Sequence, residues 1–178
     1  MTLPELVGPR VRLRAAVPAD VDAMLANGRH AEVERGYGGD GTDPEPITRE
    51  QAEAWVARMA DDPLGWVIEH GGRCVGGAGL HSLVEPDRRA SYAIGLQLPD
   101  LLGQGLGTET TRLVLHHAFE ALQLHRVVVR VLASNTRAIR CYEKCGFVVE
   151  GRERESARTR DSWEDDLIMG VLATEWIA

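Results

Sequence analysis

The residues that most directly suggest chemistry are three alternating glycines, Gly103, Gly105 and Gly107, which follow a strand-like run at 93–98. An amphipathic stretch, 106–122, begins inside this glycine loop. A strand, a tight glycine turn and a helix start let backbone N–H groups and the helix dipole converge on an anion. Glycine also lets a ligand approach the main chain, because it has no side chain. The stretch therefore predicts a site for a phosphate-bearing ligand.

The loop differs from both common nucleotide-binding motifs. The string Gly103-Gln-Gly-Leu-Gly-Thr-Glu109 lacks the lysine and adjacent hydroxyl of a Walker loop. It also lacks the Gly-x-Gly-x-x-Gly spacing, after an early strand, of the dinucleotide fold. Glycine-rich turns also serve plain structural connections, so the loop by itself does not identify its ligand.

Several predicted elements precede the loop in the sequence and must position it. Alternating apolar and basic residues at 11–15 predict a strand, and Pro18 opens a helix. Thr48 and Gln51 form a capping-box pattern for a second helix that ends before Pro63. Strand-like runs follow at 65–70, 73–84 and 90–98, and Gly76, Gly77 and Gly79 in the second run predict a bulge or a close backbone neighbour.

Further elements follow the loop. The continuously apolar run Arg126–Leu132 predicts a central strand. Asn135 caps the next predicted helix, and Gly146 ends it. Two strands, 147–150 and 165–172, complete the expected order, and the highly charged segment Glu150–Asp161 is interpreted as a solvated connection.

Length and composition narrow the class of protein. The 178 residues, 44% of them apolar, fit a single domain over 1–178 with no membrane span and no secretory signal. A formal charge of −7 disfavours nucleic-acid binding. Three cysteines, an odd number, favour the reducing cytoplasm. Cys141 and Cys145 have no second ligand pair at metal spacing, so we expect no metal, and the sequence leaves a homodimer open.

Three segments together, 103–109, 124–132 and 135–147, closely resemble the GNAT acetyltransferases. Within that superfamily the chain looks like the branch of ribosomal-protein N-terminal (alanine) acetyltransferases, and the likeness extends from Val11 to Leu172. The resemblance implies an α/β fold whose mixed β-sheet is splayed at its centre and flanked by helices on both faces. It also implies transfer of an acetyl group from acetyl-CoA to a primary amine by direct attack.

The resemblance assigns the acetyl-CoA site to two segments. The pantetheine arm would pair with the backbone of the strand before the loop, and the pyrophosphate would lie over the amides at the helix start, with the Thr108 hydroxyl as a further donor. The family has a polar residue where this chain has Leu102, which removes a side chain but no backbone donor. The expected cofactor-binding residues are Leu96, Gln97, Leu98, Gln104, Gly105, Leu106, Gly107, Thr108, Asn135 and Tyr142.

The resemblance also implies two catalytic residues. Asn135 and Tyr142 match an Asn and a Tyr that the family places near the thioester. In many members the tyrosine protonates the departing coenzyme A thiolate, which eases its departure. Taken without the family, Asn135 would be a helix cap and Tyr142 a core residue. A backbone N–H of the strand 94–98 is expected to polarise the carbonyl.

A base must take the proton of the attacking amine, and the sequence does not single one out. Glu69, His81 and Glu143 are the candidates, because they are titratable and close to the predicted central strands or to the second motif. A competing mechanism makes Cys141 or Cys145 an acyl-carrying nucleophile. We disfavour it because neither thiol has an evident base in the sequence.

The acceptor is expected to meet the loop Asn27–Pro46, interpreted as mobile and rich in glycine and acidic residues. Members of the family line the acceptor site with this region. Its candidates for binding a cationic amine are Glu34, Tyr37, Asp40, Asp43 and Glu45. The acceptor could be a protein N-terminus or a small amine of the polyamine or antibiotic type. Outside enzymes, the alternative is a regulatory module that binds acyl-CoA without turnover.

Overall fold

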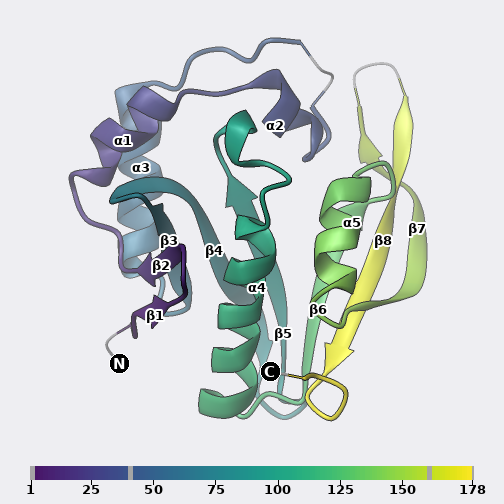
Figure 1. Cartoon of the computed structure of the whole chain (residues 1–178). Helices are drawn as coiled ribbons and strands as arrows, with labels where there is room; N and C mark the ends of the chain where they lie inside the picture. The colour runs from purple at the N-terminus through teal and green to yellow at the C-terminus, as the bar shows by residue number, and fades with distance from the viewer. Residues whose placement is uncertain (1–2, 40–41, 160–161, 178) are drawn as a thin grey trace.

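A computed structural model describes residues 3–39, 42–159 and 162–177. Within them the strands form one eight-stranded sheet in the order β1-β2-β3-β4-β5-β6-β8-β7 (Figure 1). The strands are β1 (Leu6–Val7), β2 (Val11–Arg14), β3 (Gly65–His70), β4 (Arg73–Val84), β5 (Arg89–Leu96), β6 (Arg126–Leu132), β7 (Val148–Arg158) and β8 (Trp163–Leu172). The helices are α1 (Asp20–Asn27), α2 (Ala31–Arg35), α3 (Arg49–Asp61), α4 (Leu106–His116) and α5 (Thr136–Glu143), with a 3-10 turn η1 (Pro99–Leu101) and a π-helical turn η2 (His117–Ala121).

The sheet is mixed and opens at its centre, as expected. Neighbouring strands pair antiparallel everywhere except between β5 and β6, which are parallel. That parallel pairing covers only Arg89–Ser91 of β5 and Arg126–Val128 of β6. Beyond these residues the two strands separate, and the gap between them is the centre of the candidate site.

Helices cover both faces of the sheet. α4 and α5 lie side by side in front of β5 and β6, whereas α1 and α3 pack together over the N-terminal strands (Figure 1). The main core lies between the sheet and α4, where Trp66, Leu115 and Met169 are fully buried. A second, smaller core joins α1 to α3. Every helix in the described residues is too short or too polar to traverse a bilayer.

Two local predictions from the sequence are confirmed. The Thr48 side chain accepts a hydrogen bond from the Gln51 amide, and the Gln51 side chain accepts one from the Thr48 amide, so the capping box starts α3. β4 has a register shift opposite Ile68 and Glu69. A Cβ built on Gly76 would lie 2.0 Å from the carbonyl oxygen of Gly95, so glycine is required at that crossing.

Three elements differ from the sequence-based expectation. β1 was not predicted, and the loop Asn27–Pro46 contains the five-residue helix α2. The charged segment Glu150–Asp161 is not a solvated connection, because β7 continues to Arg158. Its charges pair across the strands, as Arg152 Nη1 with Asp165 Oδ2 at 2.8 Å. None of the residues of β7 is buried, so this strand needs no apolar alternation.

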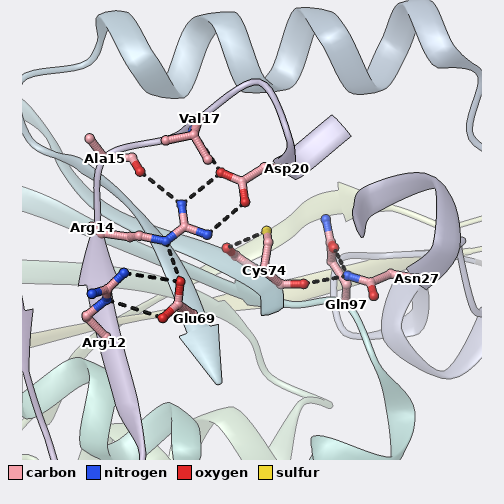
Figure 2. Close-up of polar contacts among 10 residues, drawn as sticks. Arg12, Arg14, Ala15, Val17, Asp20, Asn27, Glu69, Cys74 and Gln97 are labelled. Carbon is pink, nitrogen blue, oxygen red and sulfur yellow. Dashed lines mark hydrogen bonds and ion pairs between the residues drawn. The ribbon is translucent and has the colours of Figure 1, made fainter. Parts of the chain in front are cut away.

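A buried ion cluster fixes α1 to the edge of the sheet. Arg14 donates to both carboxylate oxygens of Asp20, at 2.8 and 2.9 Å, and to Glu69 at 2.6 Å (Figure 2). Burial opposes ionisation of Asp20, but hydrogen bonds from Arg14 and from the Val17 amide outweigh it and lower the pKa of this carboxyl. Asp20 is therefore ionised in the folded protein and tied to β2.

Replacing Asp20 by alanine should lower the free energy of unfolding by about 3 kcal/mol, because it leaves a buried guanidinium short of one partner. Asp22→Ala is the matched control: its carboxylate pairs with Arg49 at the surface, where such pairs contribute less than about 1 kcal/mol. Urea unfolding measures both. Because the pKa of Asp20 lies below its usual 3.8, the wild-type advantage should persist above that pH and shrink as pH falls further. Equal losses in the two variants would contradict this account.

Candidate active site

The separation of β5 from β6 opens a cleft of about 970 Å³. The last residues of β5 form one wall and the last residues of β6 the other. Residues of the loop 101–108 and of α5 also line the cleft, and α2 borders it. The residues that line the cleft include Tyr37, His81, Ile94, Leu96, Gly105, Gly107, Thr108, Asn135, Cys141 and Tyr142.

The exposed edge of β5 carries free backbone groups. Successive residues of a strand direct their N–H and C=O groups to opposite sides. The Gln97 amide donates to the Val75 carbonyl on the β4 side, at 2.9 Å, so Ile94 and Leu96 direct theirs toward the gap. The Ile94 carbonyl confirms this direction, because it accepts a hydrogen bond from the Tyr37 hydroxyl at 3.0 Å. An extended, amide-bearing ligand could pair with this edge as an additional strand does.

The N-terminus of α4 suits an anion. Gly105 is its N-cap in the left-handed conformation, with φ of +85°, and no side chain caps the first turn. The first amides of a helix have no partner inside it, so an uncapped end leaves donors for a ligand. Arg10, which the sequence analysis missed, adds a cation here: its guanidinium donates to the Gln104 carbonyl at 2.8 Å and pairs with Glu109.

The predicted cofactor residues divide between the cleft and its surroundings. Leu96, Gly105, Gly107, Thr108, Asn135 and Tyr142 line the cleft, whereas Gln97, Leu98, Gln104 and Leu106 do not. Gln97 is turned away, because its side-chain oxygen accepts from Asn27 at 2.8 Å (Figure 2). The Leu106 side chain is buried in the core. Of the four residues outside the lining, Gln104 and Leu106 stay candidates for ligand contact, and only through their backbone amides.

Tyr142 enters the cleft from α5. Its ring packs edge-on against Tyr92 and at a tilt against Phe147. Burial raises the pKa of Tyr142 well above its usual value of 10.0, and the nearby Cys141 thiol adds to the shift. In the described residues no protein group hydrogen-bonds to its hydroxyl. The phenol is therefore protonated at neutral pH and available to a ligand.

Asn135 holds two segments together. Its side-chain oxygen caps α5 by accepting from the Ala138 amide, and its side-chain nitrogen donates to the Gly36 carbonyl, both at 3.1 Å. Tyr37, the next residue, reaches across to Ile94 on β5. The residues after α2 thus bridge the two halves of the splayed sheet. Both polar atoms of the Asn135 side chain thus have a protein partner, which gives this residue a positioning role, and its second side-chain N–H has no protein acceptor in the described residues.

Of the three candidate bases, one lies in the cleft. His81 lines it, and its Nδ1 lies 3.0 Å from the Ser82 hydroxyl. Glu69 is held by Arg12 and Arg14, so it is already neutralised away from the gap. Glu143 lies on α5 but does not line the cleft.

The acidic residues expected to recognise an acceptor do not gather at the cleft. Glu34 pairs with Arg29 at 2.9 Å, and Asp40 lies outside the described residues. Asp43 and Glu45 do not line the cleft, so Tyr37 is the one residue of that predicted set that does. Two cations with no carboxylate partner in the described residues, Arg140 and Lys144, line it instead. They would complement an anionic ligand.

No cluster of potential metal ligands occurs in residues 3–39, 42–159 and 162–177. The donors that line the cleft include backbone amides, tyrosine and threonine hydroxyls and cationic side chains. This set suits phosphate and amide groups.

The chain matches the acetyltransferase (GNAT) domain family over residues 10–148. The spermidine N(1)-acetyltransferase of Escherichia coli is 31% identical over 104 residues, 57% of this chain and 55% of that enzyme, so the match spans about half of the relative's length. YdaF of Bacillus subtilis, named as a ribosomal N-acetyltransferase, is 27% identical over 123 residues, 68% of this chain and 67% of that protein. The structure of Vibrio cholerae spermidine N-acetyltransferase with CoA and spermine superposes with a TM-score of 0.75 at 22% identity, covering 94% of this chain and 98% of that one, and supports the fold.

Proposed function

The chain belongs to the GNAT acetyltransferase family, and we propose that it transfers an acetyl group from acetyl-CoA to a primary amine. One observation carries the proposal. The open β5 edge, the uncapped N-terminus of α4 and the Tyr142 phenol all face the same cleft. A strand edge, an anion site and a proton donor are what an amide-containing, phosphate-bearing thioester needs.

The cofactor would lie along this cleft. Its amides would pair with the Ile94 N–H and the Leu96 backbone groups, since the Ile94 carbonyl already accepts from Tyr37. Its pyrophosphate would accept from the first-turn amides around Gly105 and Gly107. Arg140 and Lys144 would neutralise the remaining phosphate charge. Leu102 contributes no polar group, so main-chain donors supply the specific contacts.

The chemistry divides between two groups. The acceptor amine must be neutral to attack, and His81 is the cleft residue placed to take its proton, directly or through water. Tyr142 keeps its proton at neutral pH and would give it to the departing thiolate. Direct attack is favoured over an acyl-cysteine, because Cys141 and Cys145 contact Thr108 at the start of α4, where the pyrophosphate, and not the thioester, is proposed to lie.

The acceptor is proposed as a cationic amine, either a polyamine or the N-terminus of a protein. A relative named as a spermidine acetyltransferase and one named as a ribosomal N-acetyltransferase match the chain and support these two acceptor classes. The ribosomal-protein branch stays a prediction for the same reason, since the matches do not separate it from the polyamine enzymes.

A thiol-release assay tests the function. Purified protein is mixed with acetyl-CoA and, separately, with spermidine, with a peptide bearing a free N-terminal alanine, or with an aminoglycoside. Amine-dependent release of coenzyme A thiol is the expected result, and mass spectrometry of the product identifies the acceptor. Tight binding of acetyl-CoA without release by any of these amines would favour the regulatory module instead.

Replacing Tyr37 by alanine should raise the KM for the acceptor amine several-fold, with little change in acetyl-CoA affinity. The reason is that Tyr37 reaches the cleft and fixes the residues after α2 against β5. Steady-state kinetics give the acceptor KM, and calorimetry gives the cofactor affinity. Glu45→Ala, in the same loop but away from the cleft, is the control. A loss confined to cofactor affinity would contradict the assignment of Tyr37 to the acceptor side.

A further inference from the structure

Two thiols meet the N-terminus of α4 at the cofactor cleft. The Thr108 hydroxyl donates to Cys141 Sγ at 3.4 Å, and Cys145 Sγ lies 3.6 Å from the Thr108 carbonyl oxygen, to which it can donate. Cys141 lines the cleft, whereas Cys145 is buried with 4% of its surface exposed. The pair therefore presents one sulfur to ligands and keeps the other inside.

The surroundings favour the thiolate at Cys141. The neighbouring Cys145 thiol lowers the pKa of Cys141; burial opposes this, and the hydroxyls of Thr108 and Thr111 and the charge of Lys144 add to the lowering. The same contact and burial raise the pKa of Cys145, against the weaker effect of Arg112. Thiolates at a helix N-terminus beside a cation are the reactive form of cysteine.

We propose that Cys141 is a modification site for small-molecule disulfides, and that the modified protein cannot bind acetyl-CoA. In the step, the Cys141 thiolate attacks one sulfur of the disulfide. A new sulfur–sulfur bond forms and the original one breaks. Cys141 is oxidised, and the other half of the disulfide is reduced and leaves as a thiolate that takes a proton from water. Cys145 is a positioning residue in this step, because both thiols contact Thr108 at the start of α4 and the Cys145 thiol adjoins the attacking sulfur.

The block on the cofactor follows from the position of Gly107. A Cβ built on Gly107 would lie 3.6 Å from Cys141 Sγ, so this sulfur borders the uncovered backbone at the start of α4. An adduct on Cys141 would occupy the space over the first-turn amides. This consequence, unlike the reactivity of the thiol, rests on the proposed function.

The chain contains its own control. Cys74 lies in β4 with 1% of its surface exposed, and burial raises its pKa to about 11. It should stay unmodified in the folded protein, because it is neither ionised nor accessible.

Oxidised glutathione is the probe, with peptide mapping by mass spectrometry to locate the adduct. In the wild-type protein at pH 7 we expect one glutathionyl group, on Cys141, formed roughly tenfold faster than on free N-acetylcysteine, of which only a few per cent is thiolate at that pH. Cys145→Ala should slow the reaction of Cys141 roughly threefold or more. The reason is that loss of the neighbouring thiol raises the pKa of Cys141 and leaves less of it as thiolate. Circular dichroism checks that the variant is folded.

Acetyl-CoA should protect Cys141, and dithiothreitol should restore cofactor binding to the modified protein. Modification first at Cys74 or Cys145, a Cys141–Cys145 disulfide without an adduct, or a rate no higher than that of the free thiol would each overturn the proposal. Rapid modification of Cys141 without protection would leave the modification site standing and refute the proposed position of the cofactor. The two ideas are thereby tested separately.

Discussion

Replacing Gly107 by alanine is expected to raise the KM for acetyl-CoA about 10- to 100-fold without lowering the melting temperature. The added Cβ would meet only ordinary contacts, 3.6 Å from Cys141 Sγ and 4.0 Å from Ile94 Cδ1, so folding is not strained. Alanine also favours a helix over glycine by up to about 1 kcal/mol. The cost falls on the ligand, because the methyl group covers amides that each contribute about 1.5–3 kcal/mol when bonded to a charged phosphate.

Leu102→Ala is the matched control, because Leu102 lines the same cleft but offers no polar group. Its effect on the KM for acetyl-CoA should be small. Differential scanning fluorimetry and steady-state kinetics measure the two properties on the same samples. Equal losses of affinity in the two variants would show that side chains, and not the amides at the start of α4, hold the pyrophosphate.

Tyr142→Phe should lower kcat by about two to four orders of magnitude, the range that general acid catalysis supplies. The KM for acetyl-CoA should change little, because the ring and its packing against Tyr92 and Phe147 remain. Burial holds the pKa of Tyr142 above 10.0, so wild-type kcat should show no loss of this acid between pH 7 and that value. A pH series of kcat for both proteins is the measurement.

Tyr92→Phe provides the comparison for that experiment. Tyr92 is fully buried beside Tyr142, but its hydroxyl bonds to Thr111 at 3.1 Å. Its loss should cost about 1 kcal/mol of stability and leave kcat within a small factor. If the two variants lost kcat equally, Tyr142 would act by packing and its assignment as the acid would be abandoned.

Local patterns in the sequence predicted a large share of the fold. The capping box at Thr48, the apolar run of β6 and the glycines of β4 each specify their element through short-range physics. The splayed centre came from the family resemblance, and the pairing of β5 with β6 over three residues agrees with it. The start of β7 was predicted, but its continuation from Glu150 to Arg158 was missed, because its charges are balanced by partners on β8 that no local pattern shows.

The parts of the site that a local motif places could be predicted from the sequence. The parts held by residues far away in the sequence could not. The glycine loop and Tyr142 lie in the cleft because their own motif places them there. No local pattern shows that Asn135 bonds to Gly36, 99 residues earlier, or that Arg10 bonds to the loop from 94 residues away. The orientation of Gln97 depends on strand alternation counted from a bulge in a neighbouring strand, which sequence periodicity does not fix.

The order of the strands has a consequence for how the protein is made. β1 to β5 follow one another in the sheet as they do in the chain, so each can pair as soon as it leaves the ribosome. β8 lies between β6 and β7: it pairs with β7 and along the whole of β6, whereas β5 pairs with only three residues of β6. The second wall of the cleft is therefore complete only after β8 has been synthesised. A nascent chain that ends before Trp163 would lack β8 and a complete cleft, so cofactor binding would begin only once β8 has been made.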